Sequence, residues 1–378
     1  MVAAIPQGAP AEALQGAAQA YQQASGRRVA VVVLSASAYA PQVEAALLAG
    51  LDRYDLLLLP GDSLARWAGY RVILPLAAPP DAPELAAWLP ALRVAGELYG
   101  LPTQPEAEVI WYRADLLAAA GLAAPRTWAG FEQAARALHN PPERYGAVIA
   151  GGPLDSGSEF AAVLPGFGGA LIGPGGQAQA ASPAAVAALS WYAGLRNTVG
   201  VVPPQAADFT RADALRLLGQ GRAGLGIAPL SAAVVLQDCA ASPAVCADGA
   251  PLLAWTWLPG AVTPGSLSAW AIPRGAANPS AAADFAAWLC AEEGALAWAA
   301  AGGTPAHRAV LAGLDRPESA LSQVEVFQPA FPPIATGDQV WKAVHAAVHA
   351  AVAGEQSPAA ALQEAQRQVE RAVRRVDR

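Results

Sequence analysis

The sequence predicts an α/β protein of two lobes, and three observations support this prediction. A continuous apolar run at 29–34, which is typical of a strand covered on both faces, and a second buried strand expected at 54–59 alternate with helices. Such alternation indicates βαβ units and a mostly parallel sheet. The chain has 378 residues, which is too long for one simple core. Because no low-complexity linker separates two halves, we expect the chain to cross between the lobes more than once.

The first hundred residues predict three strand–helix pairs. Strands are expected at 2–5, 29–34 and 54–59, and helices at 11–25, 41–50 and 64–69. Gly26 ends the first helix, and Asp62 with Ser63 caps the third. In a parallel sheet, ligands bind at the loops beyond the carboxyl ends of the strands. Polar residues at those ends are therefore candidate ligand groups: Ser35, Ser37, Asp62 and Ser63.

The segment 97–138 predicts a strand, an irregular turn, a second strand at 109–112 and two helices. Gly121 stops the first helix, and Thr127 is the expected N-cap of the second. Glu106 is then expected on the turn between the two strands, beside aromatic residues. A carboxylate held there by a rigid scaffold is a candidate binding group.

The remainder repeats the same alternation of elements. Strands are expected at 146–150, 223–227, 252–258 and 267–272, and helices at 183–196, 212–219 and 280–289. Ser357 and Pro358 form an N-cap and N1 pair that opens the final helix.

Composition excludes several classes of protein. The chain is 54% hydrophobic and 14% charged with a net charge of −7, so it is neither disordered nor a typical nucleic-acid binder. Its basic residues cluster only at the C-terminus: Arg371, Arg374, Arg375 and Arg378. No apolar run has the roughly 18 residues that a membrane span needs. The segment 284–301 comes nearest, and Glu292 and Glu293 interrupt it.

The cysteines and the N-terminus bear on the compartment. Cys239 and Cys246 flank a short loop whose spacing does not match common zinc sites, so a local disulfide and two free thiols both stay open. A disulfide would indicate an oxidising compartment. Cys290 is expected to pack inside a helix. Residues 1–6 show neither the basic nor the apolar region of a signal peptide, so the chain is either cytoplasmic or has had a signal removed.

The motifs associated with catalysis or metal binding are incomplete. His345 and His349 share one helical face, but no zincin Glu and no third ligand accompany them, so we expect no metal. The glycine-rich stretch at 166–169 lacks the third small residue of a dinucleotide loop, so we expect no cofactor. No nucleophile has a neighbouring base, so we expect no catalytic residue and no enzyme activity.

The aromatic residues favour sugar binding. Sugars present flat C–H faces to aromatic rings and hydroxyl pairs to carboxylates, and charge-assisted hydrogen bonds contribute about 1.5–3 kcal/mol. Of eleven tryptophans, four stand near predicted loops or hinges: Trp111, Trp257, Trp270 and Trp341. Five others are expected in the core: Trp88, Trp128, Trp191, Trp288 and Trp298.

The order of short segments resembles the extracellular solute-binding proteins of bacterial ABC transporters, in the maltose- and trehalose-binding branch (family 1). YQQASGRRV at 21–29 is similar to the family's FExxTGxxV, and YDLLLLP at 54–60 to its second strand. LYGLP at 98–102, WYRADLL at 111–117 and PRTW at 125–128 are similar to its YGLP, YNKDLL and PxTW segments. LPG at 258–260, ANP at 277–279 and GGTP at 302–305 then follow in the family order.

The resemblance implies a type II periplasmic-binding-protein fold, with a cleft between lobes that close about hinge crossovers. It places 1–108 and 262–310 in the N-terminal lobe, and 109–261 and 311–378 in the C-terminal lobe. It also implies a periplasmic or extracellular monomer that associates with the membrane through an ABC permease.

The resemblance further implies a set of ligand-binding residues. Asp62 and Glu106 stand where the family has binding carboxylates, and Glu159 stands near a third acid. Trp270 and Trp341 match stacking tryptophans, and His345 matches a polar partner one turn later. The candidate set is Asp62, Ser63, Glu106, Glu159, Trp257, Trp270, Trp341 and His345. Ser231 stands where the family has an aromatic residue, so the resemblance does not imply that maltose is the ligand.

We therefore expect a neutral mono- or oligosaccharide to be bound and delivered to an ABC permease, without turnover. Two alternatives stay open. The same fold could bind a polyamine, phosphate or a metal complex, or it could act as a ligand-sensing or enzymatic domain.

Overall fold

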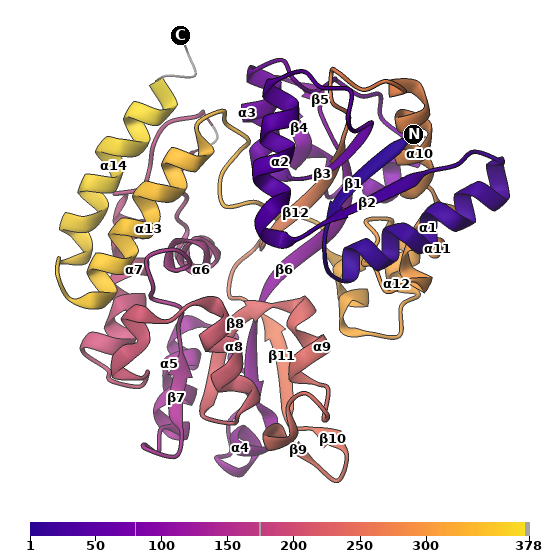
Figure 1. Ribbon diagram of the computed structural model, residues 1–378. Coiled ribbons are helices and arrows are strands. Elements are labelled where there is room, and N and C mark those ends of the chain that lie inside the picture. Colours follow the sequence, from indigo (N-terminus) through magenta and orange to yellow (C-terminus); the bar gives the residue numbers. More distant parts are fainter. Residues whose placement is uncertain (80, 174, 375–378) are drawn as a thin grey trace. The chain divides into compact units, whose positions relative to one another are not determined.

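The computed structural model describes residues 1–79, 81–173 and 175–374, so Arg375 and Arg378 of the C-terminal arginine cluster lie outside the described residues. It divides into two compact units (Figure 1). Unit 1 comprises Met1–Glu106 and Ser266–Gly337, and unit 2 comprises Ala107–Gly265 and Asp338–Arg378. The chain thus changes unit three times.

The last change of unit differs from the sequence prediction. It was expected after residue 310, and the structure places it after Gly337. The segment before Gly337 belongs to unit 1 because it packs against Trp88. Trp88 Nε1 donates to Ala306 O at 2.9 Å, and the ring centroids of Trp88 and Phe327 are 5.2 Å apart. These contacts join residues more than two hundred positions apart, so local patterns could not reveal them.

Unit 1 is built on a sheet with the strand order β2-β1-β3-β12 (Figure 1). The strands are β1 (Val2–Pro6), β2 (Ala30–Leu34), β3 (Leu56–Pro60) and β12 (Thr263–Ala271). β1 pairs in parallel with β2 and β3, whereas β12 pairs antiparallel with β3. Asp55, which is 2% exposed, accepts from the backbone N–H of Val2 and of Asn278, both at 2.7 Å. This carboxylate therefore joins β1 to the start of α10.

Helices and short elements surround this sheet. They are α1 (Ala9–Ser25), α2 (Ala36–Leu48), α3 (Leu64–Gly69), α10 (Pro279–Cys290), α11 (Glu292–Ala300), α12 (Arg308–Ala312), the 3₁₀ turns η1 (Gly61–Ser63), η2 (Ala82–Leu85), η3 (Leu89–Leu92) and η8 (Pro317–Gln323), and the short strands β4 (Arg93–Val94), β5 (Glu97–Leu98) and β13 (Phe327–Gln328). The second helix begins at Ala36 rather than at the predicted 41, so Pro41 lies inside it. Ser35, in extended conformation before it, is its N-cap residue.

In unit 2, β6 (Leu101–Arg113) pairs antiparallel with β8 (Ala223–Pro229) and β11 (Leu253–Trp257). β7 (Tyr145–Val148) pairs in parallel with β8. Its other elements are α4 (Ala114–Ala119), α5 (Trp128–Leu138), α6 (Ser156–Val163), α7 (Pro183–Asn197), α8 (Arg211–Gly219), α9 (Ala233–Leu236), α13 (Gly337–Ala353), α14 (Pro358–Arg374), η4 (Leu164–Phe167), η5 (Pro204–Asp208), η6 (Leu230–Ala232), η7 (Pro243–Val245), β9 (Cys246–Ala247) and β10 (Ala250–Pro251).

Side-chain caps define the starts of three helices in unit 2. Thr127 accepts from Gly130 N at the start of α5, and Ser182 accepts from Ala185 N at the start of α7. Thr210 and Asp213 form a reciprocal capping box on α8. A cap of this kind contributes about 1 kcal/mol. These starts are therefore fixed by local sequence.

The long strand β6 corrects the prediction for Glu106. The sequence predicted an irregular turn there, because Pro102 and Pro105 interrupt the apolar pattern. The structure instead has one continuous strand, irregular only at Gln104, whose φ is 46°. The Gln104 N–H is satisfied by Thr304 O at 3.2 Å, which lets the strand continue. Glu106 thus lies on a strand, at the point where the chain leaves unit 1.

The structure joins Cys239 and Cys246 in a disulfide with a Cα–Cα distance of 5.7 Å. The bond closes a short loop of unit 2 between α9 and the hairpin of β9 and β10. Cys290 is free and 2% exposed, in α10 of unit 1. Burial raises the pKa of the Cys290 thiol to about 12, so it is held in its unreactive form.

Candidate functional site

Two candidate residues of unit 1 lie in the turn that follows β3. Asp62 and Ser63 belong to η1, and both are partly buried. The Ser63 hydroxyl donates to Pro60 O at 2.7 Å, so its proton is used within the turn. The Ser63 oxygen and the Asp62 carboxylate are acceptors at the carboxyl end of a strand, where α/β sheets bind ligands.

Glu106 is the other acidic candidate of unit 1. Along β6, buried and partly buried residues alternate around it, with Pro105 and Ala107 buried and Glu106 partly buried. Alternation places its side chain on the opposite face of the strand from those two neighbours. Its carboxylate is therefore held by a rigid strand rather than by a flexible loop.

Trp270 does not have the exposure that a stacking residue needs. It lies on β12, is 1% exposed, and packs edge-on against Trp298 with ring centroids 5.7 Å apart. Its ring faces are covered by the protein, so we assign Trp270 to the core of unit 1. The physical reason is its position on β12, which is paired with β3, and the cover that Trp298 of α11 provides. Trp111, another aromatic candidate, is likewise a core residue, at 0% exposure on β6.

In unit 2, Trp257 lies at the end of β11 and is partly buried. Its ring meets Trp255 edge-on, with centroids 5.3 Å apart. Because Trp257 is only partly buried, some of its indole surface stays accessible. Trp257 is thus able to offer a flat apolar surface.

Glu159 is 1% exposed in α6 and is held from inside the unit. Its Oε2 accepts from Ala150 N at 3.0 Å, and its Oε1 has no hydrogen-bond partner among the described residues. Burial raises the pKa of Glu159 to about 7, although the Ala150 N–H and the charge of Arg211 act against this rise. A side chain this deeply buried offers no surface to a ligand, so we assign Glu159 a supporting role.

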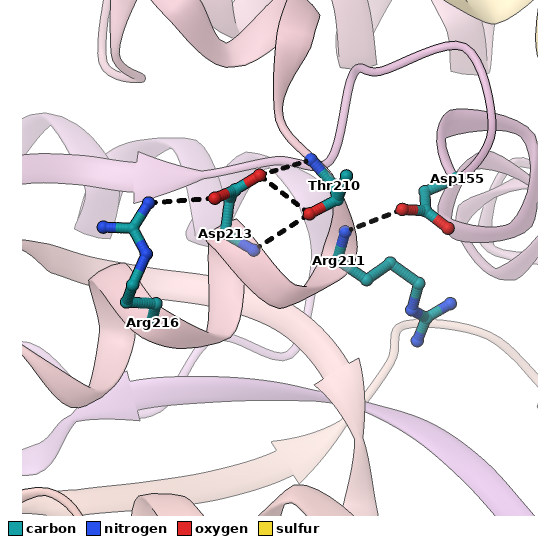
Figure 2. A network of polar contacts seen from close by, with 5 residues as sticks. All are labelled: Asp155, Thr210, Arg211, Asp213 and Arg216. Atoms are coloured by element: carbon teal, nitrogen blue, oxygen red, sulfur yellow. Dashed lines mark hydrogen bonds and ion pairs between the residues drawn. The ribbon is translucent and has the colours of Figure 1, made fainter. Parts of the chain in front are cut away.

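An ionic network near Glu159 could not be predicted from the sequence. Arg211 donates through its guanidinium to Glu108 at 2.5 Å, across 103 residues of chain. The Arg211 backbone N–H donates to the Asp155 carboxylate at 3.0 Å, beside the capping box of Thr210 and Asp213 (Figure 2). The spacing of Thr210 and Asp213 could have indicated the capping box. No pattern of neighbouring residues could have indicated the contact between Arg211 and Glu108, which are 103 residues apart.

The network contains more acid than base. Asp155, Glu108 and Glu159 surround one guanidinium, and the nearby carboxylates raise the pKa of Arg211 against the effect of burial. Glu108 in turn contributes to the raised pKa of Glu159. A buried cluster of this kind is stabilised when one carboxyl group takes up a proton, and Glu159 is the group placed to do so.

Trp341 and His345 are brought together on α13. Their rings are stacked, with centroids 5.5 Å apart and an interplanar angle of 27°. Both side chains are partly buried. His345 Nδ1 accepts from Gly157 N at 3.0 Å, and His345 O accepts from the Ser156 hydroxyl at 3.3 Å. α13 is thereby attached to the first turn of α6.

The bond from Gly157 fixes the tautomer of His345. A ring nitrogen that accepts carries no proton, so the neutral ring has its hydrogen on Nε2. Burial lowers the pKa of His345, and the negative charge of Asp155 opposes this effect. His345 is therefore held in its neutral form.

The described residues contain no group of three or more His, Cys, Asp or Glu side chains that could hold a metal ion. His349 binds the backbone instead, since its Nδ1 lies 3.1 Å from Gly151 O. Within the part of the chain that the structure describes, no helix is long and apolar enough to cross a membrane.

Comparison with known proteins yields one curated relative and many solved structures. The mannitol-binding protein of Pseudomonas aeruginosa is 26% identical over 254 residues, a match that spans 64% of this chain and 57% of that protein. Maltose-bound MalE3 of T. maritima superposes with a TM-score of 0.80 at 22% identity, covering 98% of both chains. A solute-binding protein of Agrobacterium vitis S4 with bound D-mannitol gives 0.75 at 21% identity, covering 99% of this chain and 98% of that one.

These superpositions confirm the predicted α/β fold of two-lobed binding proteins. The model of one protein family, described as bacterial extracellular solute-binding protein, matches residues 16–319. This match spans most of the sequence and both units. The chain belongs to the family of bacterial extracellular solute-binding proteins.

Proposed function

We propose that this protein binds a neutral sugar or sugar alcohol outside the cytoplasm and delivers it to an ABC permease. Membership of the extracellular solute-binding family carries the proposal. The ligand class is supported by the proteins it resembles, which are described with mannitol, maltose, ribitol and tagatose.

The chemistry of the candidate residues fits a polyhydroxyl ligand. Unit 1 offers oxygen acceptors at Asp62, Ser63 and Glu106, and unit 2 offers aromatic surface at Trp257 and Trp341. Carboxylates bind pairs of hydroxyl groups, and indole rings cover the C–H faces of a sugar. We propose that affinity for one sugar depends on residues of both units.

We further propose that the protein does not transform its ligand and that it acts as a periplasmic or extracellular monomer, membrane-associated through its transporter. The family is one of binding proteins, which supports the first part of this proposal. His345 is held as a neutral ring by a backbone N–H, and Glu159 is buried, so neither is placed to act on a bound sugar.

A thermal-shift screen tests the ligand class. The panel contains maltose, trehalose, mannitol, ribitol and tagatose, with spermidine and phosphate as non-sugar comparators. A ligand at about 100 times its Kd should add roughly 2.7 kcal/mol to the free energy of unfolding. Each mixture is then analysed by chromatography. Stabilisation by spermidine or phosphate alone would overturn the ligand class, and release of a sugar product would overturn the absence of turnover.

A further inference from the structure

The first turn of α6 lacks a cap of its own. Asp155 occupies its N-cap position but makes no side-chain bond to this helix. The Asp155 carboxylate accepts instead from Arg211 N at the start of α8 (Figure 2). Ser156 N and Ser158 N donate to Gly152 O and Asp155 O, so the N–H of Gly157 needs a partner from elsewhere.

His345 is that partner. Its Nδ1 accepts from Gly157 N at 3.0 Å, from a position 188 residues away in the chain. The approach is so close that a Cβ on Gly157 would lie 2.9 Å from both the backbone N and the Nδ1 of His345. Only glycine at 157 permits this contact without a shift of α13.

The same imidazole supports Trp341 with its face. The two rings are stacked at 5.5 Å, so His345 uses its ring edge for α6 and its ring face for the indole. We propose that His345 is a positioning residue that acts on the ligand through Trp341, and that only its neutral form holds the indole in the binding orientation. This rests on the proposed function, in which Trp341 contacts the sugar.

Protonation of His345 opposes this arrangement directly. A proton on Nδ1 would turn the acceptor into a donor that faces the Gly157 N–H. Asp155, before α6, is the charged group that acts on this ring. The other titratable side chains of α6 and α13 are Glu159, which is bonded to Ala150 N, and Asp338, Lys342 and His349. Of these, Asp155 favours the protonated ring, whereas burial disfavours it. Acidification to well below pH 6.5 should therefore release the ring from α6.

The ligand-free protein provides the first test. Nitrogen NMR should show His345 as the Nε2–H tautomer at pH 7.5. The indole N–H signal of Trp341, assigned by its loss in Trp341→Phe, should shift with the same midpoint as the His345 titration. An indole signal that does not move through that titration would overturn the coupling, whatever the ligand proves to be.

The second test measures Kd against pH by calorimetry, with the sugar or sugar alcohol that gives the largest stabilisation in the screen. Below the pKa of His345, the wild-type Kd should rise by up to about tenfold per pH unit, the limit for one linked proton. His345→Asn keeps an acceptor for Gly157 N but cannot titrate, so its Kd should be higher at pH 7.5 and constant down to pH 5. The matched control is His349→Asn, which should retain the wild-type pH dependence.

The outcomes separate the two proposals. Equal pH slopes in wild type and His345→Asn, or a wild-type Kd that does not change with pH, would overturn the role of His345 while leaving sugar binding intact. Binding of no sugar at all would overturn the proposed function. The NMR titration would then still decide whether His345 controls Trp341.

Discussion

Two aromatic pairs, one in each unit, have nearly the same ring separation and quite different surroundings. Trp270 and Trp298 of unit 1 are 5.7 Å apart, edge-on, and at most 2% exposed. Trp341 and His345 of unit 2 are 5.5 Å apart, stacked, and partly buried. Ring distance therefore does not separate a core pair from a pair that we propose for ligand binding. The difference lies in exposure and in the partner ring, which is another indole in unit 1 and a titratable imidazole in unit 2.

The largest expected effect is on the free energy of unfolding, when one ring of the Trp270–Trp298 pair is removed. Trp270→Ala should reduce the free energy of unfolding by about 3–5 kcal/mol, because it leaves a cavity in a close-packed core. Chemical denaturation without ligand measures this. The matched control is Trp288→Ala, on α10 of the same unit. The Trp288 ring is only partly buried, so its removal should reduce the free energy of unfolding by less. A Trp270→Ala protein of wild-type stability with weakened sugar affinity would return Trp270 to the binding site.

The next effect concerns Glu159, which lies on α6, the helix to which His345 is hydrogen-bonded. Burial raises the folded-state pKa of Glu159 to about 7, above the ordinary glutamate value of 4.5. The stability that its protonated form contributes is therefore complete below pH 4.5 and is lost as pH rises through 7. Glu159→Gln cannot ionise, so the variant should not lose this stability as pH rises. At pH 8 the variant should be more stable than wild type, by up to about 3 kcal/mol, and at pH 4.5 the two should be nearly equal.

Denaturant titrations at pH 4.5 and pH 8 decide this point. Glu355→Gln, at an exposed position after α13, should show no such difference between the two pH values. A Glu159→Gln variant that is destabilised by the same amount at both pH values would show that folding does not raise the pKa of Glu159.

A smaller effect, on affinity rather than stability, is expected at Trp341. Trp341→Ala should weaken sugar binding by about 2 kcal/mol or more, the scale of a binding hot spot. The unfolding free energy of the ligand-free protein should change less than in Trp270→Ala. Calorimetric titration beside a melt measures both, and Trp288→Ala should keep wild-type affinity. If Trp341→Ala destabilises the ligand-free protein as much as Trp270→Ala does and keeps the wild-type Kd, the contrast between the two pairs fails.

The smallest effect tests what unit 1 contributes in place of an aromatic ring. Glu106→Gln retains the shape of the side chain and removes its charge, so it should cost about 1–2 kcal/mol of binding through loss of charge assistance. The melting temperature should hardly change. Glu97→Gln, at an exposed position in the same unit, is the control for charge removal. Equal affinities in both variants would leave unit 1 without a demonstrated carboxylate ligand.

Several features could be predicted because they depend on residues close together in the chain. The caps at Thr127 and Ser182 need an oxygen and an N–H three residues apart, and the apolar run at 56–59 needs only its own pattern. The class of fold followed from the alternation of such segments. In each case the interacting groups are neighbours, so periodicity and spacing carry the information.

The prediction for Glu106 failed in part for a physical reason of a different kind. Pro102 and Pro105 indicate a turn when only their neighbours are considered. The strand continues because a distant carbonyl, that of Thr304, satisfies the irregular backbone at Gln104. The resemblance supplied the expectation that Glu106 is a binding carboxylate, but it did not supply the conformation of the chain at that point.

The sequence by itself determined the helices with local caps, the buried strand at 56–59, the closeness of Cys239 to Cys246, and the family resemblance. The strand at 30–34 was also expected to be covered on both faces, but it is an edge strand with no buried residue. Only the tertiary structure decided which aromatic residues are core and which acids are buried, since burial depends on what packs against a residue from elsewhere. It also decided the contacts of Arg211 with Glu108 and of Gly157 with His345, across 103 and 188 residues. Such pairs form because unsatisfied N–H groups and charges are costly once removed from water, and the available partner is set by the fold rather than by spacing along the chain.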